Sequence, residues 1–116
     1  MSKERKELGR EGEQQAALFL KKQGYKIIEQ NLKLKIGEID LLAKDIDGTI
    51  VIVEVKTKRD ESISEPHESV TIAKQRKLLM LARIIEEFYP RNPIRIDVIS
   101  ITDLKIEHLK NAIWKK

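Results

Sequence analysis

The sequence contains no cysteine, which excludes disulfide bridges, zinc–thiolate sites and cysteine nucleophiles. No apolar run approaches the roughly 20 residues that a helix needs to cross a bilayer. The charged N-terminal stretch MSKERKELGR lacks the apolar segment of a signal peptide. Two Phe, two Tyr and one Trp leave little for an aromatic platform that stacks on bases. These absences predict a cytoplasmic protein without a membrane partner.

The residues that are present suit one soluble globular domain. Hydrophobic residues make up 41% of the 116 positions and charged residues 36%, a mixture that argues against disorder. No repeat, low-complexity tract or linker divides the chain, so we expect a single domain over residues 1–116. The 23 Lys and Arg outnumber the 19 Asp and Glu, for a net charge of +4. This charge is compatible with a polyanionic partner but is also common in proteins without one.

The spacing of apolar residues changes along the chain between the periods of helices and strands. The expected elements are a helix over residues 8–23, strands over 25–34, 36–44 and 49–57, a helix over 71–89, a strand over 94–101 and a C-terminal short strand or helix. An Asp-Gly pair at 47–48 indicates a hairpin turn, and the polar segment 58–70 is expected to be a loop. The order α-β-β-β-α-β predicts an α/β layered fold with a mixed central sheet.

Three charged residues lie on the otherwise apolar second and third strands. Because side chains alternate between the faces of a strand, Glu54 and Lys56 emerge on one face. The hairpin then brings Asp40 alongside them. The same alternation places Ile39 and Leu41 together on the face opposite to Asp40.

The first helix carries a further acid, Glu13, on the same stripe as Ala16 and Leu20. An unpaired carboxylate is costly on a core-facing stripe. Glycines at positions 9 and 12 would let this helix approach the sheet closely. We therefore expect Glu13 to point at the sheet.

The chemistry depends on whether Glu13, Asp40 and Glu54 converge. Two carboxylates about 5 Å apart repel by about 3 kcal/mol at an effective dielectric constant near 20, and Lys56 balances only one of the three charges. The remaining charge suits a divalent cation, and all-oxygen ligands favour Mg²⁺ or Mn²⁺ over zinc. Lys56 would orient or deprotonate a water, or contact a phosphate, in metal-assisted phosphodiester hydrolysis. The alternative is an exposed strand end with a salt bridge between Asp40 and Lys56.

Basic residues near these strands are candidate nucleic-acid contacts. Lys58 and Arg59 follow the third strand, and Lys74 and Gln75 open the second helix. A contact with phosphate would explain their clustering. A solvated helix start explains Lys74 and Gln75 equally well.

Other polar and aromatic residues are expected to be structural. Arg95 and Asp97 share a strand face and are predicted to pair with each other. His67 and His108 show no ligand-like spacing, so we assign them no metal role. Tyr25, at a strand end, is expected to pack against the core.

Gly37–Asp40 (GEID), followed after residues 41–53 by Glu54-Val55-Lys56, resembles the signature of the PD-(D/E)XK nuclease superfamily. The motif lies in the matching order of helices and strands. Nearly the whole chain is similar to the YraN-like family of predicted endonucleases. The similar stretches are Gly9–Ala17, Gly24-Tyr25, Asn31, Gly37–Leu42, Val53–Thr57, Lys74–Leu78, Arg95–Val98 and His108–Trp114. Archaeal Holliday-junction resolvases are more distantly similar in the same core.

The resemblance implies a restriction-endonuclease-like fold and a set of site residues. Asp40 and Glu54 would be metal ligands, helped by the Val55 carbonyl. Lys56 would be the catalytic lysine, and Glu13 matches the first-helix acid of the resolvase-like branch. The proline of the "PD" half is missing before Asp40. The ligand assignment is unaffected, because proline has no metal-binding atom.

The function that the resemblance implies is a Mg²⁺- or Mn²⁺-dependent endonuclease acting on DNA. Branched or single-stranded DNA in repair or recombination is the expected substrate, and the resolvase-like relatives suggest a homodimer. One alternative is a non-catalytic nucleic-acid-binding module with the same fold, which clustered acids beside phosphates disfavour. Another is a scaffold protein whose acids form structural salt bridges.

Overall fold

A computed structural model describes residues 3–58, 70–103 and 105–114 of the chain. The elements in chain order are α1 (Lys3–Lys22), β1 (Lys26–Leu34), β2 (Gly37–Lys44), β3 (Ile50–Thr57), α2 (Ile72–Phe88), β4 (Ile94–Ile101) and β5 (Ile106–Ile113). The predicted order of elements is confirmed, and the C-terminal segment forms a fifth strand rather than a helix. Most of the predicted loop, residues 59–69, lies outside the described residues.

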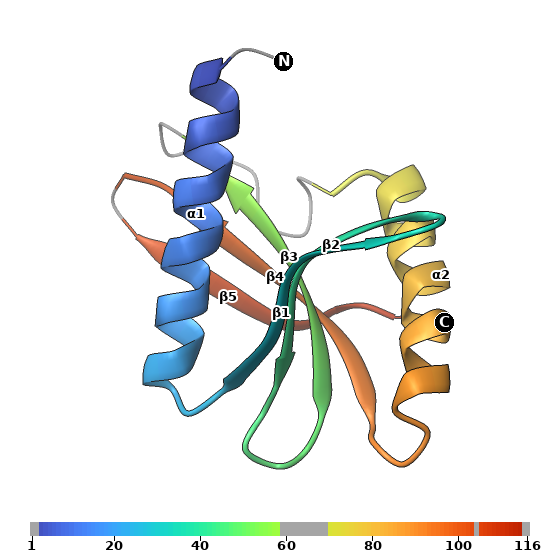
Figure 1. Ribbon diagram of the computed structural model, residues 1–116. Coiled ribbons are helices and arrows are strands. Elements are labelled where there is room, and N and C mark those ends of the chain that lie inside the picture. Colours follow the sequence, from blue (N-terminus) through green and yellow to red (C-terminus); the bar gives the residue numbers. More distant parts are fainter. Residues whose placement is uncertain (1–2, 59–69, 104, 115–116) are drawn as a thin grey trace.

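The strands form one sheet in the order β1-β2-β3-β4-β5. β3 and β4 run parallel and the other neighbouring pairs are antiparallel, so the sheet is mixed, as predicted. α1 covers one face of the sheet and α2 covers the other (Figure 1). Neither described helix is long and apolar enough to cross a membrane.

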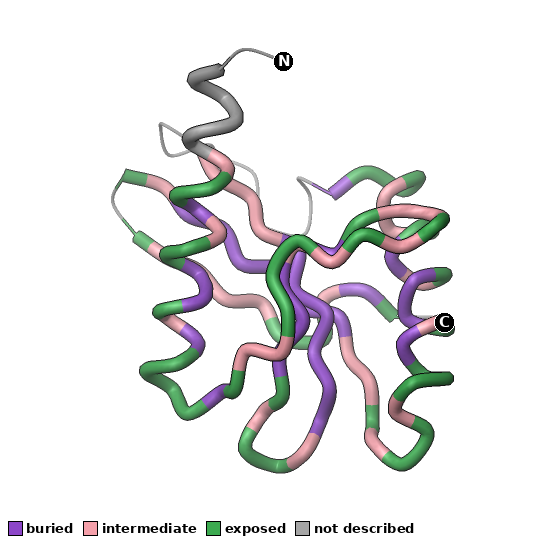
Figure 2. The backbone as a smooth tube through the Cα atoms, in the orientation of Figure 1, coloured by how far each residue is buried: buried purple, intermediate pink, exposed green. Residues whose placement is uncertain are grey.

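β3 is the central strand, and its first residues are apolar on both faces. Ile50 and Ile52 pack into the cluster under α2, while Val51 and Val53 pack into the cluster under α1. All four are completely buried, and Figure 2 shows most of β3 as a continuous buried stretch. Glu54 is the first charged residue of this strand, so it lies where the apolar core ends.

α2 begins after Thr71, whose side-chain Oγ1 accepts a hydrogen bond from the Lys74 N–H at 3.1 Å. The helix covers the sheet with an apolar stripe, whereas Phe88, which the apolar spacing also predicts on this stripe, is exposed. Its buried residues are Leu78, Leu81, Ala82 and Ile85. The N-terminal end of α2 and the C-terminal end of β3 lie at the same end of the molecule (Figure 1).

α1 packs closely against β3 because Gly12 has no side chain. A Cβ atom at this position would overlap the methyl group of Thr57. A Cβ atom on Gly9 would meet nothing within 4 Å. The close approach at Gly12 places the next residue, Glu13, beside the sheet.

In the ladder of β1 and β2, Asn31 and Asp40 lie between the pairs Gln30–Leu41 and Leu32–Ile39. Asn31 has a φ of 53°, a left-handed conformation that Asn adopts more readily than most residues. Ile39 packs in the cluster under α2, whereas Leu41 packs in the cluster under α1. The prediction that Ile39 and Leu41 share a face is therefore wrong, because the strand turns over between them. Beyond this point the hairpin bends over α2 (Figure 1).

Candidate active site

The candidate site lies where β2 and β3 separate. Their ladder ends at the pair formed by Leu41 and Val53. One residue further on, Asp40 Oδ2 accepts a hydrogen bond from the Val55 N–H at 2.9 Å. A side-chain carboxylate thus bonds the N–H of β3 beyond the end of the backbone ladder. This bond fixes Asp40 next to Glu54.

Glu54 is buried, with 4% of its surface exposed, but it is poorly hydrogen-bonded. Its Oε1 atom is buried and accepts no hydrogen bond from the described residues. The Lys56 ammonium lies 3.5 Å from Oε2, and the Lys74 ammonium lies 3.8 Å from Oε1. Both distances are longer than those of strong charge-assisted hydrogen bonds. A buried carboxylate oxygen without a donor is costly, and a cation bound at Glu54 would relieve this cost.

The carboxyl groups of the site ionise less readily than usual. Burial and the neighbouring charge of Asp40 raise the pKa of Glu54 to about 7, and two nearby lysines only partly oppose this shift. Burial raises the pKa of Asp40, although the hydrogen bond from Val55 acts in the opposite direction. Burial and the charge of Asp40 also raise the pKa of Glu13. A divalent cation would stabilise the ionised form of all three groups.

Glu13 approaches this pair from α1. The pKa of its carboxyl group is raised by burial and by the charge of Asp40, and the nearby Asn31 side chain acts in the opposite direction. Within the part of the chain that the structure describes, no group of three or more His, Cys, Asp or Glu side chains is arranged to hold a metal ion. A bound ion would therefore take further ligands from water, from a backbone carbonyl such as that of Val55, or from a phosphate. Mg²⁺ commonly keeps such ligands.

The four residues predicted to contact nucleic acid have different surroundings in the structure. Lys74 is directed to the acids, as described above. Gln75 donates its side-chain amide to the Val70 carbonyl at 2.9 Å, so it secures the chain just before α2. Lys58 extends the pairing of β3 with β4 through its backbone N–H. Arg59 lies outside the described residues.

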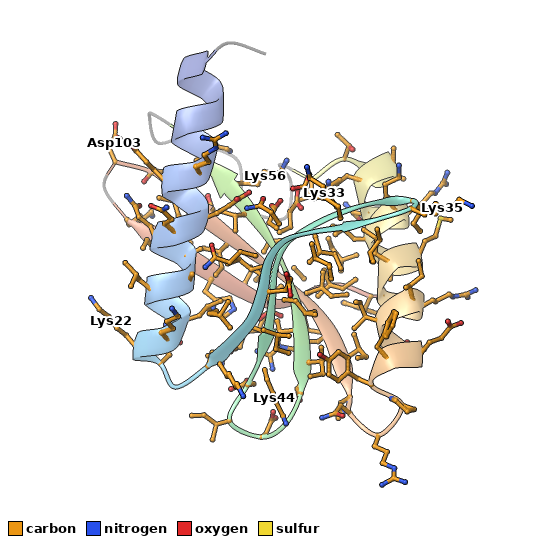
Figure 3. All side chains as sticks on the ribbon, in the orientation of Figure 1. Lys22, Lys33, Lys35, Lys44, Lys56 and Asp103 are labelled. Atoms are coloured by element: carbon orange, nitrogen blue, oxygen red, sulfur yellow. The ribbon has the colours of Figure 1, made fainter. Side chains whose placement is uncertain are left out.

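Sequence reasoning missed two features near the site. Asn31 has a positive φ and its side chain lies near Glu13, and only the tolerance of Asn for positive φ could have suggested this feature. Lys33 and Lys35 are exposed near the tip of the hairpin, at the same end of the molecule as Lys56 (Figure 3). The alternation of Lys with apolar residues was visible in the sequence, but the direction of the hairpin was not.

A second polar cluster lies on the α1 side of the sheet. The predicted pair is confirmed: Arg95 donates to the two carboxylate oxygens of Asp97 at 3.0 and 3.2 Å. His108 Nε2 lies 2.7 Å from Asp97 Oδ2. Arg95 also donates to the hydroxyl of Tyr25 at 2.7 Å, and Tyr25 is buried, so its expected packing role is confirmed. His67 lies outside the described residues.

Comparison with known proteins identifies the family. The model of the uncharacterised protein family UPF0102 matches residues 12–101. A UPF0102 protein of Thermodesulfovibrio yellowstonii is 46% identical over 109 residues, covering 93% of this chain and 96% of the relative. One of Persephonella marina is 41% identical over 106 residues, covering 90% of each protein.

Two solved structures share the fold at low sequence identity. An EndoMS-dsDNA2 complex superposes with a TM-score of 0.51 and 24% identity, over 78% of this chain and 35% of that chain. A repair endonuclease from Pyrococcus abyssi superposes with a TM-score of 0.52 and 20% identity, over 79% of this chain and 38% of that chain. This chain thus spans little more than a third of either protein and shares with them a nuclease-like fold. By its family match and its relatives, the chain belongs to UPF0102, the YraN-like family that its sequence resembles.

Proposed function

We propose that the chain is a Mg²⁺- or Mn²⁺-dependent endonuclease that hydrolyses DNA phosphodiester bonds. One observation carries the proposal: Glu54 Oε1 is buried without a hydrogen-bond donor from the described part of the chain, beside Asp40 and on the strand that carries Lys56. Carboxylate oxygens are ligands that suit hard divalent cations. The nuclease-like fold, shared with a protein solved on double-stranded DNA, supports DNA as the substrate class.

Each site residue has a distinct part in the proposed reaction. Asp40 and Glu54 would hold the ion, with the Val55 carbonyl and Glu13 as further ligands. When bound, the ion would stabilise the negative charge that develops at phosphorus. The Lys56 side chain is 34% exposed, so its ammonium lies at the boundary between the buried acids and solvent. From there it would orient the attacking water or contact a phosphate oxygen.

The proposed DNA path crosses the end of the molecule where β3 ends and α2 begins. Lys33, Lys35 and Lys56 lie at this end, whereas Lys22 and Lys44 lie at the opposite end (Figure 3). Ammonium groups at one end would bind phosphates independently of sequence. Branched or single-stranded DNA, a homodimer and a cytoplasmic location belong to this proposal.

A non-catalytic nucleic-acid-binding module is the second candidate, and one observation favours it. The ammonium groups of Lys56 and Lys74 lie 3.5 and 3.8 Å from the Glu54 carboxylate. Two lysines therefore balance the two acids at the centre of the site. In this state the charges of Asp40 and Glu54 are balanced without a metal ion, and such a protein would bind DNA without cleaving it.

Cleavage assays separate the two candidates. Plasmid, single-stranded and four-way-junction DNA would be incubated with Mg²⁺ or Mn²⁺, or with EDTA. We expect metal-dependent cleavage that Glu54→Gln and Lys56→Ala each reduce by at least about 1,000-fold, because both remove groups that stabilise the transition state. Lys44→Ala, at the opposite end, should cleave like the wild type, and circular dichroism checks that all variants fold. Cleavage that persists in EDTA or in Glu54→Gln contradicts the proposal, and salt-sensitive binding without cleavage supports the second candidate.

The proposed DNA path has its own test. We expect the double variant Lys33→Ala/Lys35→Ala to bind DNA about tenfold more weakly than the wild type in EDTA. The slope of log affinity against log salt should also fall by up to about two, because each phosphate contact contributes about one. Lys22→Ala/Lys44→Ala is the matched control, with the same loss of charge at the other end. Equal losses in both double variants, measured by fluorescence anisotropy, would show that only net charge matters.

A further inference from the structure

Lys74 occupies an electrostatically unusual position in the first turn of α2. Its backbone N–H is capped by Thr71, and the neighbouring Gln75 amide bonds the Val70 carbonyl, so this turn is firmly placed. The first turn of α2 contains no acidic residue. A helix N-terminus favours negative side chains, and the capping position that Lys74 fills is commonly Glu or Gln. A lysine here is locally unfavourable, so its compensation must come from elsewhere in the fold.

That compensation is Glu54. The Lys74 ammonium lies 3.8 Å from Glu54 Oε1, the same buried oxygen that accepts no hydrogen bond from the described residues. The Lys74 side chain is 35% exposed, whereas that of Glu54 is 5% exposed. The ammonium therefore neutralises the buried oxygen from the solvent side without a hydrogen bond that would hold it there. Lys56 faces the other oxygen, Oε2, so each oxygen of Glu54 faces one ammonium.

We propose that Lys74 is a built-in counter-ion that competes with the divalent cation for Glu54 and is drawn onto a DNA phosphate when substrate binds. The proposal rests on the proposed function, since it concerns the same carboxylates. Without DNA, the ammonium of Lys74 repels a cation at Glu54. With DNA, a phosphate gives Lys74 a new partner and leaves Glu54 Oε1 to the metal. Because such coupling is reciprocal, DNA raises the affinity for the metal and the metal raises the affinity for DNA.

Metal titration without DNA tests the competition directly. Mn²⁺ binding to the wild type, Lys74→Met and Lys74→Arg would be measured by calorimetry and by the loss of the free-ion EPR signal. Lys74→Met removes the charge and keeps the length of the side chain, so we expect at least about fivefold tighter Mn²⁺ binding. Lys74→Arg keeps the charge and should bind Mn²⁺ like the wild type.

Lys77→Met is the control for net charge on α2. Lys77 is one turn further along the helix and is exposed, with its stem against Gly37. We expect its removal to change Mn²⁺ affinity less than twofold, because no ion pair joins it to Glu54 among the described contacts. Equal tightening in Lys77→Met and Lys74→Met would overturn the proposal in favour of a general charge effect.

The coupling is tested in a Lys56→Ala background, in which the proposed cleavage is lost and DNA stays intact. We expect a short DNA duplex to tighten Mn²⁺ binding several-fold, and this gain should shrink when Lys74→Met is added. If Lys74→Met leaves the DNA-induced gain in Mn²⁺ affinity unchanged, Lys74 does not move from Glu54 to a DNA phosphate. If neither Lys74→Met nor the wild type with duplex DNA binds Mn²⁺, the proposed function itself fails. If the wild type binds Mn²⁺ and Lys74→Met binds it equally, only the counter-ion role fails.

Discussion

Two buried carboxylates in this protein have opposite surroundings. Asp97 is completely buried and receives hydrogen bonds from Arg95, His108 and the backbone N–H of Asn111 at 2.7 to 3.2 Å. Glu54 is nearly as buried, yet its closest described cations lie at 3.5 and 3.8 Å and its Oε1 has no donor. The carboxylate of Asp97 is therefore fully hydrogen-bonded, whereas that of Glu54 is incompletely hydrogen-bonded by the described residues.

The pKa values follow from this difference. Burial would raise the pKa of Asp97, but hydrogen bonds from His108, Arg95 and Asn111 more than offset it and lower the pKa. At Glu54 burial and the charge of Asp40 prevail, and the pKa rises to about 7. A buried charge stabilises a fold only when it is paired and hydrogen-bonded. Asp97 therefore has the surroundings of a structural residue, whereas the charge of Glu54 is incompletely compensated by the described residues.

α1 contacts both regions. Phe19 packs edge-to-face on His108, with ring centroids 6.1 Å apart, and Glu13 lies near Asp40. The structural network therefore anchors one part of the helix, and the candidate site lies beside another part. Three predictions test this contrast, in addition to those given above.

The largest expected effect on stability comes from the matched amide substitutions. Asp97→Asn should lower the free energy of unfolding by about 2–3 kcal/mol, because a neutral amide replaces a buried carboxylate that accepts hydrogen bonds from Arg95 and Asn111, while Arg95 keeps its ion pair with Asp45. Glu54→Gln should leave the free energy of unfolding unchanged or raise it by about 1 kcal/mol, since it removes a charge that is costly to bury. Urea denaturation of both variants measures the difference. A comparable loss of unfolding free energy in both variants would show that Asp97 and Glu54 do not differ in their contribution to stability.

The pH dependence of stability should also separate the two acids. In EDTA, Glu54 keeps its proton in the folded state up to about pH 7 but loses it near its ordinary pKa of 4.5 in the unfolded state. The folded state binds more protons in this window, so stability should fall by up to about 3 kcal/mol as the pH rises from 4.5 to 7. Glu54→Gln should flatten that fall.

Asp97 should act in the opposite direction at lower pH. Its folded-state pKa is lowered from the ordinary value of 3.8, so the stability it contributes is present above that value. This stability should be lost as the pH falls further towards the folded-state pKa. Thermal unfolding in EDTA at a series of pH values measures both the fall in stability between pH 4.5 and 7 and the loss of stability at lower pH. A wild-type curve that rises between pH 4.5 and 7 would contradict the assignment of Glu54.

The smallest effects concern the contact of α1 with the sheet. Gly12→Ala should destabilise the protein by about 1–3 kcal/mol, because the new methyl group overlaps Thr57 and pushes Glu13 away from Asp40. Gly9→Ala adds the same methyl group where nothing lies within 4 Å. It should stabilise the helix by about 0.5–1 kcal/mol. Chemical denaturation compares the two, and equal responses would show that α1 does not approach the sheet closely at Gly12.

Much of the fold could be predicted because its signals are local. The strand over residues 94–101 has the predicted bounds, since a run of apolar residues between Pro93 and polar residues has few other interpretations. The neighbourhood of Asp40 and Glu54 followed from the predicted hairpin of the second and third strands. The Arg95 and Asp97 pair followed from a spacing of two along one strand.

Other features could not be predicted because they depend on tertiary contacts. The change of face between Ile39 and Leu41 arises where Asn31 takes a positive φ, and strict alternation cannot show it. The approach of Lys74 to Glu54 depends on where α2 is placed after residues 59–69. Sequence alone placed Lys74 equally well in solvent.

The sequence by itself determined the order of elements, the apolar faces of the helices and the strand positions of the acids, because periodicity and turn residues act over a few neighbours. Only the tertiary structure decided which buried acid is satisfied. Hydrogen-bond partners of a buried group come from distant parts of the chain, as when Arg95 reaches Tyr25 across 70 positions. Asp97 gained hydrogen bonds from Arg95 on its own strand and from His108 and Asn111 on β5, whereas Glu54 Oε1 gained none from the described residues, and that difference distinguishes a structural network from a candidate active site.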